Sequence, residues 1–485
     1  MKYWIPLTIF LLPLLWNLLR PGFYTSHDGE WMVIRLTAFH DALRQGQFPV
    51  RWLPRLNHGY GYPVANFLYP LPFYLAEPVY FLTGDPAAAI QFIMAISVVS
   101  MALGMFAWLH SGNKILSSLI GSLTYVYSPY VAFNLYQRGS LGEIAAMGIV
   151  PWIFWAVSRN KLPLASLFLA MLILSHNVVA ILFLPLIVAY KFYKSYKGYK
   201  NYKPATVFLI LGIGLAAFFW MPALFELRFV RTGQISVSDF QNEYLTFTEA
   251  LNRTGIVTAI FSAGAPLFFL TKSSSWLWET LKFAQVIQFP WRLLSLFSFI
   301  SAAISSRFIN KISDIVTPRH CEERSDVAIS AGLPRFGTSD VPPLTMTIVI
   351  VVVSFASSIK YLTPTSFINR PPEYYQTNDD TTTVRAEYTP IWVTDLPQKR
   401  PEIPQVHYYP GWKIFIDGKE TSIADPKSTG GILSPAAPPN NPQSIQFRFA
   451  ETPLRTFANL LSIAAALVWL RFSSPPQTPS LQSPQ

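Results

Sequence analysis

The segment SHDGEW, residues 26–31, places a histidine and two carboxylates within four positions, just after the first long apolar run. A carboxylate held at a membrane surface can accept the proton of an acceptor hydroxyl as a general base. Two carboxylates can also hold a divalent cation, Mg²⁺ or Mn²⁺, that neutralises a phosphate leaving group. Asp28 and Glu30 are therefore candidate catalytic and metal-binding residues, and His27 is a candidate substrate contact. The structural alternative is that Asp28 is only the N-cap of the next helix.

A second polar segment, YQRGSLGE, covers residues 136–143 in the next predicted outer loop. Arg138 offers a planar fork of donors that suits a phosphate, and Glu143 adds another carboxylate. Both are candidate substrate-binding residues. The alternative is an interfacial salt bridge or an arginine whose head group reaches back to the membrane surface.

Arg292, in the segment QFPWRLL, stands at the predicted outer end of an apolar run and departs from the usual placement of positive charge inside the cell. It either binds a lipid phosphate or anchors the helix at the headgroups. His176 and Asn177 in SHN, and Glu226 in FWMPALFELR, are further substrate-binding candidates. For these three we favour helix–helix hydrogen bonding or loop structure.

No motif of a soluble enzyme is present: the chain has no Walker loop, GxGxxG, HExxH, CxxC or GxSxG. Its histidines show no metal-ligand spacing, so the sequence does not predict a zinc site. They stand at positions 27, 40, 58, 110, 176, 320 and 407.

The composition requires a membrane environment for the elements that carry these residues. Of 485 residues, 51% are hydrophobic and only 13% charged, which is too apolar for a soluble protein of this length. Several charge-free windows approach the length that spans a bilayer. We expect a polytopic α-helical membrane protein with about ten transmembrane helices. The windows are residues 3–19, 88–109, 115–136, 205–224, 293–306, 344–359 and 457–470.

The net charge of +11 does not indicate a nucleic-acid partner, because lysines and arginines collect in short loops beside apolar runs. Their main consequence is topological. The loops expected in the cytoplasm contain Lys2, Arg159 with Lys161, the run KFYKSYKGYKNYK from Lys191 to Lys203, and Arg307 with Lys311. The loop that holds SHDGEW is then outside.

The first outer loop, residues 20–86, begins with an amphipathic pattern that predicts a helix lying in the membrane interface from Asp28 to about Gly46. The following stretch is crowded with Pro, Tyr and Phe. We expect an irregular interfacial or re-entrant segment there.

A second outward region, residues 360–456, has the period of strands. WKIFIDGKETSI alternates around Asp417-Gly418, a strong two-residue hairpin turn, and SIQFRF alternates likewise. A small β-sandwich-like module is predicted. One cysteine, Cys321, excludes a disulfide framework, so this module must fold on core packing.

The expected partition follows from these patterns, while the topology of residues 162–190 and 225–288 stays open. Residues 1–311 form the transmembrane domain, and 312–343 are a polar cytoplasmic insertion that resembles a translated genomic repeat and is predicted to be disordered. A transmembrane helix at 344–359 leads to the outer module, a last helix at 457–471 returns the chain, and 472–485 form a disordered tail.

In order along the chain, a series of motifs resembles the bacterial membrane-protein family labelled 6-pyruvoyl-tetrahydropterin synthase-related. The match runs over most of the sequence, although nothing in it resembles a pterin synthase zinc site. The motifs are SHDGEW, GYGYPVANFLYPLPFYL, YQRGSLGE, LILSHN, FWMPALFE, QFPWRLL, EYTPIWV, YYPGWKIFIDGK and TPLR.

The layout of that family is similar to the GT-C class of membrane glycosyltransferases, which carry a catalytic acidic residue in the first outer loop. By this resemblance Asp28 is the catalytic position, with Glu30 near it as a D-x-E pair. The resemblance implies transfer of a sugar from a polyprenyl-phosphate donor to an envelope acceptor at the outer face of a prokaryotic plasma membrane. The alternative is a non-catalytic scaffold, or a carrier of lipid-linked intermediates, in envelope assembly.

Overall fold

The computed structural model describes residues 4–196, 203–232, 243–281, 287–316, 341–380, 387–437 and 442–473. The chain forms two compact units, which are treated separately below. The first contains residues 1–32, 87–155 and 238–370, and the second contains residues 33–86, 156–237 and 371–485. Cys321, most of the predicted insertion and the tail from residue 474 lie outside the described residues, so those predictions stay open.

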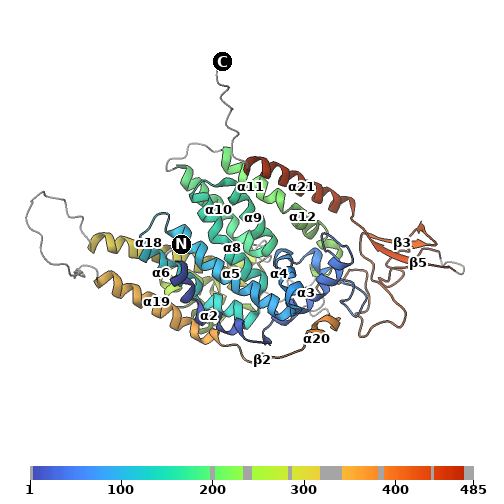
Figure 1. The fold of residues 1–485 in the computed structure, drawn as a ribbon, viewed down its shortest axis with the longest axis horizontal. Coiled ribbons are helices and arrows are strands. Elements are labelled where there is room, and N and C mark those ends of the chain that lie inside the picture. The colour runs from blue at the N-terminus through green and yellow to red at the C-terminus, as the bar shows by residue number, and fades with distance from the viewer. Residues whose placement is uncertain are drawn as a thin grey trace, which may run out of the picture. The chain divides into compact units, whose positions relative to one another are not determined.

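Among the described residues, six helices are long and apolar enough to cross a membrane. The protein is therefore a polytopic α-helical membrane protein, as predicted, and Figure 1 labels these helices. They are α5 (Pro86–Leu109), α8 (Leu141–Ser158), α10 (Asn177–Tyr196), α18 (Leu293–Val316), α19 (Val341–Leu362) and α21 (Pro453–Ser473). A bent pair, α11 (Lys203–Leu215) and α12 (Ala217–Phe225), counts as a seventh span if its 71° bend lies within one crossing. Two shorter apolar helices are α6 (Ile115–Val126) and α9 (Leu162–Ser175).

Two of the charge-free windows do not form spanning helices. The window 3–19 is divided into α1 (Trp4–Ile9), α2 (Leu12–Leu15) and the 3-10 turn η1 (Trp16–Leu19). A proline in the first turn begins α2, and a proline cannot donate the hydrogen bond that would continue a preceding helix. The window 115–136 is interrupted in the same way, because α6 ends at Val126 and Pro129 starts a new element.

Helix α18 of the first unit, which begins next to Arg292, packs against α6 and α19, as Figure 1 shows. Small residues line this contact. A Cβ atom added to Gly121 of α6 would lie 2.8 Å from the Ala302 carbonyl oxygen, so only glycine permits this approach. The Ser128 and Ser298 hydroxyls bond at 2.6 Å, which fixes the register of α18.

Short helices complete the first unit, including the part of residues 225–288 that belongs to it. In the described residues 243–281 none reaches spanning length. They are α7 (Pro129–Ala132), the π-helix η3 (Phe133–Arg138), α14 (Phe247–Thr254), α15 (Ile256–Phe261), α16 (Ala265–Phe269), the 3-10 turn η6 (Lys272–Ser274), α17 (Ser275–Thr280) and the 3-10 turn η8 (Pro290–Arg292). Two short strands, β1 (Phe23–Tyr24) and β2 (Phe367–Ile368), pair antiparallel.

The second unit contains most of α3 (Gly29–Arg44), the helix predicted after Asp28. The proline-rich stretch that follows is irregular only in its first half, which ends in the 3-10 turn η2 (Pro63–Asn66). Its second half is the helix α4 (Leu71–Thr83), because Pro72 occupies the first turn, where no N–H is needed. Residues 162–190 make two helices, α9 and α10, that break at His176. The short elements η4 (Leu227–Phe229) and α20 (Pro372–Thr377) also belong here.

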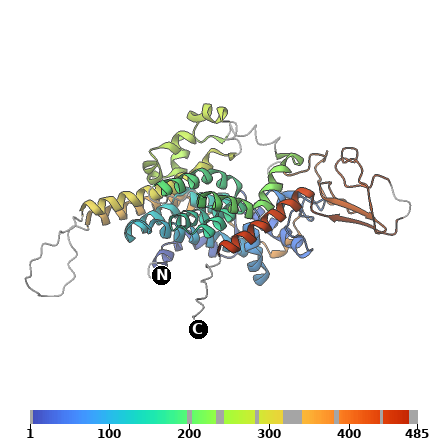
Figure 2. The same cartoon turned by 90° about the horizontal axis from the view of Figure 1, so that it is seen from above.

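The predicted small β module is present in the second unit as a three-stranded antiparallel sheet ordered β4-β3-β5. Strand β3 (Trp412–Ile416) pairs with β4 (Lys419–Thr421) and β5 (Ile445–Phe449). Asp417 and Gly418 both have positive φ, which confirms the hairpin turn between β3 and β4. The described residues supply one sheet rather than the two of a sandwich, because the rest of the module forms turns and isolated bridges. In Figure 2 the sheet leads into α21.

Candidate functional site

The predicted catalytic segment lies between the strand β1 and the helix α3. The Ser26 hydroxyl accepts a hydrogen bond from the Gly29 N–H at 3.2 Å, so Ser26 caps the start of the helix. Among the described residues no backbone N–H donates to the Asp28 carboxylate, which is half-buried. Asp28 occupies the N-cap position through its backbone, because its carbonyl accepts from the Met32 N–H at 3.2 Å, but its side chain makes none of the capping bonds that the alternative requires.

The loops of the two predicted motifs dock against each other in the first unit. The His27 N–H donates to the Gln137 carbonyl at 3.0 Å, and the Asp28 N–H donates to the Arg138 carbonyl at 2.7 Å. Gly139 ends the π-helix η3 with φ +65°, and a Cβ atom there would lie 2.6 Å from Gly29 Cα. The glycines of both motifs thus allow an approach that a side chain would block.

Arg138 and Glu143 form a buried ion pair beside this contact. Arg138 Nη1 donates to Glu143 Oε2 at 2.7 Å and to Asn134 Oδ1 at 2.8 Å. The Tyr130 hydroxyl donates to Glu143 Oε1 at 2.5 Å. Burial opposes the charge of Arg138, but neighbouring Glu143, Tyr130 and Asp28 outweigh it and hold its pKa above the usual value. Asp28 is thus within electrostatic range of Arg138.

Arg292, the third predicted cation, reaches the same glutamate from the start of α18. Its Nε atom lies 3.9 Å from Glu143 Oε2, and Asp28 is again within electrostatic range. Its Nη1 atom donates to the Ile287 carbonyl at 2.9 Å and to Gln288 Oε1 at 2.7 Å. Four residues predicted separately from three segments therefore meet: Asp28, Arg138, Glu143 and Arg292.

Arg253, at the end of α14, is a neighbour that the sequence analysis missed. Its guanidinium carbon lies 4.4 Å from the ring centroid of Phe133 and 4.9 Å from that of Trp291. Burial lowers the pKa of Arg253 below its usual value. Nearby Tyr361 and Glu249 raise it again, but only in part. Nothing in LNRTG marks this arginine, since its partners come from distant segments. We call Arg138, Glu143, Arg253 and Arg292 the arginine cluster.

The arginine cluster has more donors than acceptors. Arg138 and Arg292 face Glu143, while Arg253 is within electrostatic range of Arg138 and of its own carboxylate neighbour, Glu249. Among the described residues, Arg292 Nε, Arg253 Nη1, Asn134 Nδ2 and Trp291 Nε1 are buried without a hydrogen-bond partner. Unpaired buried donors that include two guanidinium groups are what an anion such as a phosphate satisfies.

The other residues of the first motif point elsewhere. Glu30 Oε1 accepts from Arg370 Nε at 2.6 Å, so this carboxylate is engaged by the segment after β2. His27 is exposed and contributes its backbone N–H. Within the described residues, the one set of three or more metal-capable side chains contains neither Asp28 nor Glu30. The predicted Mg²⁺ or Mn²⁺ at this pair stays a prediction.

Glu226, His176 and Asn177 belong to the second unit and make structural contacts there. Glu226 is bound bidentately by Arg455, with Nη2 to Oε2 at 2.8 Å and Nε to Oε1 at 2.9 Å. The His176 ring accepts from the Val179 N–H at 3.2 Å and so caps α10. Asn177 is exposed and donates to the Phe67 carbonyl at 3.4 Å.

Further partners extend the Glu226 contact into a larger set. The Asn66 amide donates to Glu226 at 2.8 Å and the Tyr409 hydroxyl at 3.1 Å. Arg51 bonds Glu451 at 2.8 Å and Asn459 at 3.0 Å. We call this set, Asn66, Arg51, Glu226, Tyr409, Glu451, Arg455 and Asn459, the glutamate network.

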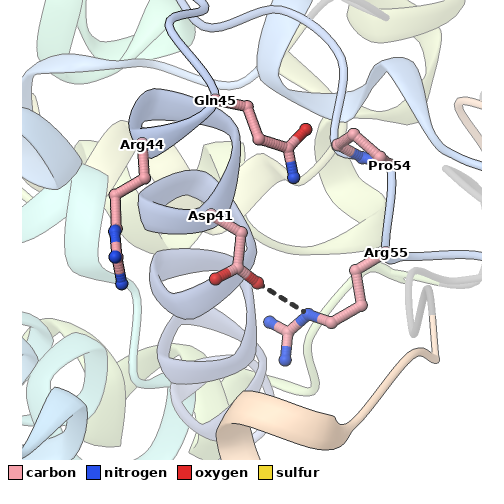
Figure 3. Close-up of a pocket in the computed structure, with 5 residues that line it drawn as sticks. All are labelled: Asp41, Arg44, Gln45, Pro54 and Arg55. Atoms are coloured by element: carbon pink, nitrogen blue, oxygen red, sulfur yellow. Dashed lines mark ion pairs between the residues drawn. The ribbon is translucent and has the colours of Figure 1, made fainter.

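An open cavity of about 380 Å³ in the second unit involves none of the predicted residues. Figure 3 shows its lining of Asp41, Arg44, Gln45, Pro54 and Arg55, with Arg55 Nε 3.3 Å from Asp41 Oδ2. The Arg55 Nη atoms are engaged by the Tyr375 carbonyl and Thr37. We place the candidate site at the arginine cluster, where unpaired donors converge.

A known family matches the part of the chain that contains the arginine cluster. Residues 65–303 match the sequence profile of the 6-pyruvoyl-tetrahydropterin synthase related domain, a membrane protein. The resemblance to that family is confirmed. Arg138, Glu143, Arg253 and Arg292 lie inside the matched region of the family, and Asp28 lies before it.

A relative and a solved structure extend this comparison. An uncharacterized protein of Lactococcus lactis subsp. cremoris is 26% identical over 247 residues, which are 46% of this chain and 39% of that protein. The arabinofuranosyltransferase AftD from Mycobacteria, solved by cryo-EM, is similar at a TM-score of 0.46 and 16% identity, over 77% of this chain and 28% of that chain. This chain therefore covers well under two thirds of the length of the Lactococcus protein and of AftD.

Proposed function

We propose that this chain is a GT-C-like membrane glycosyltransferase. It moves a sugar from a polyprenyl-phosphate donor to an envelope acceptor on the extracytoplasmic side of a prokaryotic plasma membrane. The observation that carries the proposal is the arginine cluster, because its unpaired buried donors stand beside Asp28, a half-buried carboxylate whose side chain makes no capping bond among the described residues. The family match supports the membrane setting.

The arginines act on the leaving group. As the bond between the sugar C1 and the phosphate oxygen breaks, its electron pair goes to the phosphate, and negative charge accumulates there. Arg292 and Arg253 hold buried N–H groups available to that charge, and Arg138 adds its fixed cation. Donors arranged before the reaction stabilise such charge without reorganising, which is a large contribution to rate.

Glu143 positions these cations rather than contacting the acceptor. Both of its oxygens are engaged, one by Tyr130 and one by Arg138, and its side chain is fully buried. It keeps two guanidinium groups together that would otherwise repel each other. This placement differs from the substrate contact expected from the sequence.

Asp28 is the base. It takes the proton of the acceptor hydroxyl while the acceptor oxygen bonds to the sugar C1, and its backbone N–H is held by the Arg138 carbonyl at 2.7 Å, which places it beside the arginine cluster. A cation at Asp28 and Glu30 fits the residues poorly, because Glu30 is bonded to Arg370 and no third metal-capable side chain of the described residues joins the pair. No step of this mechanism passes through a metal.

The test is transfer from a panel of polyprenyl-phosphate sugars by the purified chain in lipid membranes. Asp28→Asn should lower transfer by about 10²–10⁴-fold, the usual contribution of a general base. Asp314→Asn is the matched control, because Asp314 is an exposed carboxylate paired with Lys114. Full transfer by Asp28→Asn would contradict the proposal, as would donor binding by the wild type without any turnover, the result expected of a scaffold or carrier.

A further inference from the structure

A second group of ionisable side chains, unconnected with the proposed transfer chemistry, gathers in the second unit. His58 comes from the loop after α3, and Asp379 and Asp380 follow the short helix α20. Their ligand atoms all lie within 4.8 Å of one another. His58 Nδ1 is 3.3 Å from Asp379 Oδ1, and His58 Nε2 is 3.7 Å from Asp380 Oδ1.

The backbone holds His58 in place for this contact. Asn57, His58 and Gly59 all have positive φ, a conformation that non-glycine residues adopt only when other contacts fix it. The His58 N–H donates to the Asp379 carbonyl at 2.9 Å. The Asn57 amide and the His407 ring nitrogen bond at 2.9 Å. The imidazole therefore faces the two carboxylates without further rearrangement of the chain.

Charge and accessibility also suit a cation. Arg400 bonds the second oxygen of Asp379, which is also within electrostatic range of Arg55. Among the described residues Asp380 has no ion-pair partner besides His58, so its carboxylate is open to a cation. The exposed fractions are 24% for His58, 22% for Asp379 and 52% for Asp380, so an ion can enter from solvent.

We propose that His58, Asp379 and Asp380 bind a divalent transition-metal ion of the Zn²⁺ or Mn²⁺ class. Ligand atoms around such an ion in a tetrahedral site are about 3.4 Å apart, close to the 3.3 Å between His58 Nδ1 and Asp379 Oδ1. Asp380 contacts the other ring nitrogen, Nε2, so its exposed side chain rotates when one ring nitrogen binds the ion. An imidazole nitrogen disfavours Mg²⁺ and Ca²⁺, which prefer oxygen ligands only. The ion would link the loop after α3, which contains His58, to the segment after α20, which contains both aspartates.

The experiment titrates ZnCl₂, MnCl₂, MgCl₂ and CaCl₂ into the purified full chain in detergent after chelator treatment, by calorimetry. We expect one equivalent of Zn²⁺ or Mn²⁺ to bind the wild type and to raise its thermal midpoint. Asp380→Asn should weaken this binding by at least about tenfold, and His58→Gln should remove the preference over Mg²⁺.

His40→Gln is the matched control, because His40 pairs with a single carboxylate, Glu77, at 2.8 Å. It should bind metal like the wild type. Asp380 is exposed, so its variant tests the site without loss of folding, which circular dichroism verifies. Equal affinity of wild type and Asp380→Asn would overturn the proposal, as would a folded wild type that binds none of the four ions.

Discussion

The arginine cluster and the glutamate network both bury arginines against carboxylates, yet they are built differently. In the glutamate network two arginines face two glutamates, and each guanidinium is engaged by acceptors. In the arginine cluster Arg138 and Arg292 share Glu143, and buried donors of Arg253 and Arg292 have no hydrogen-bond partner among the described residues. Complete hydrogen bonding of the buried guanidinium groups indicates a structural role, whereas unpaired buried donors indicate a ligand.

The same contrast appears in where the partners come from. Glu226 and Arg455 are 229 positions apart and bring the end of α12 together with α21 within the second unit. Arg138 and Glu143 are five positions apart, held by the turn at Gly139, so this pair needs no distant segment, and Arg253 and Arg292 join it from elsewhere in the first unit. Removing a partner from the glutamate network should therefore act on folding, and removing one from the arginine cluster should act on ligand binding.

The largest effect is expected from Arg455→Met, which leaves Glu226 buried without its bidentate partner. Loss of one partner of a buried pair costs about 3–5 kcal/mol. Denaturation in mixed micelles measures the change in the free energy of unfolding. Arg448→Met is the control, because Arg448 is exposed on β5. Equal stability of the two variants would mean that the glutamate network is not structural.

Acid should weaken the second unit through His407. Burial, with the charge of Arg231, lowers the pKa of this histidine to about 4 from the ordinary 6.5. As the pH falls, His407 of the unfolded chain therefore takes up its proton before His407 of the folded chain does. The free energy of unfolding keeps its full value above about pH 6.5 and decreases by about 3 kcal/mol as the pH drops toward 4. We expect the free energy of unfolding, measured across this pH range, to lose its pH dependence in His407→Gln. The control His110→Gln should keep it, because His110 is exposed.

Contact between the two motif loops is tested by Gly139→Ala. A Cβ atom there meets Ser26 and Gly29 at 2.5–2.6 Å, in addition to the strain of φ +65°. Gly84→Ala is a matched control, because Gly84 has φ +70° and nothing within 4 Å of the added atom. The crowded variant should be less stable than the control by about 1–3 kcal/mol and lose transfer activity. If both variants behave alike in unfolding and transfer, the loops do not need this contact.

Sequence patterns predicted the parts of the molecule that depend on local order. The apolar windows from residues 88 and 457 correspond to α5 and α21, and the hairpin at Asp417-Gly418 is present. The run 3–19 was predicted wrongly as a candidate span, because composition was given more weight than its prolines at 6 and 13.

Contacts between distant segments leave no recognisable pattern in the amino-acid sequence. Arg253, the partners of Glu226 and the proximity of His58 to Asp379 arise from tertiary packing, and single residues of these types occur throughout the chain. The convergence of Arg138 and Arg292 became visible only with the fold. The roles proposed for these residues stay predictions.

The account depends most directly on whether the arginine cluster binds phosphate. Binding of a polyprenyl phosphate to the purified chain in micelles should exceed binding of the matching uncharged polyprenol. Arg292→Gln and Arg253→Gln should each weaken phosphate binding by about tenfold, since one charge-assisted hydrogen bond is lost, and Arg448→Gln should not. Equal affinity for the phosphate and the alcohol, or phosphate binding unchanged in both cluster variants, would contradict the account.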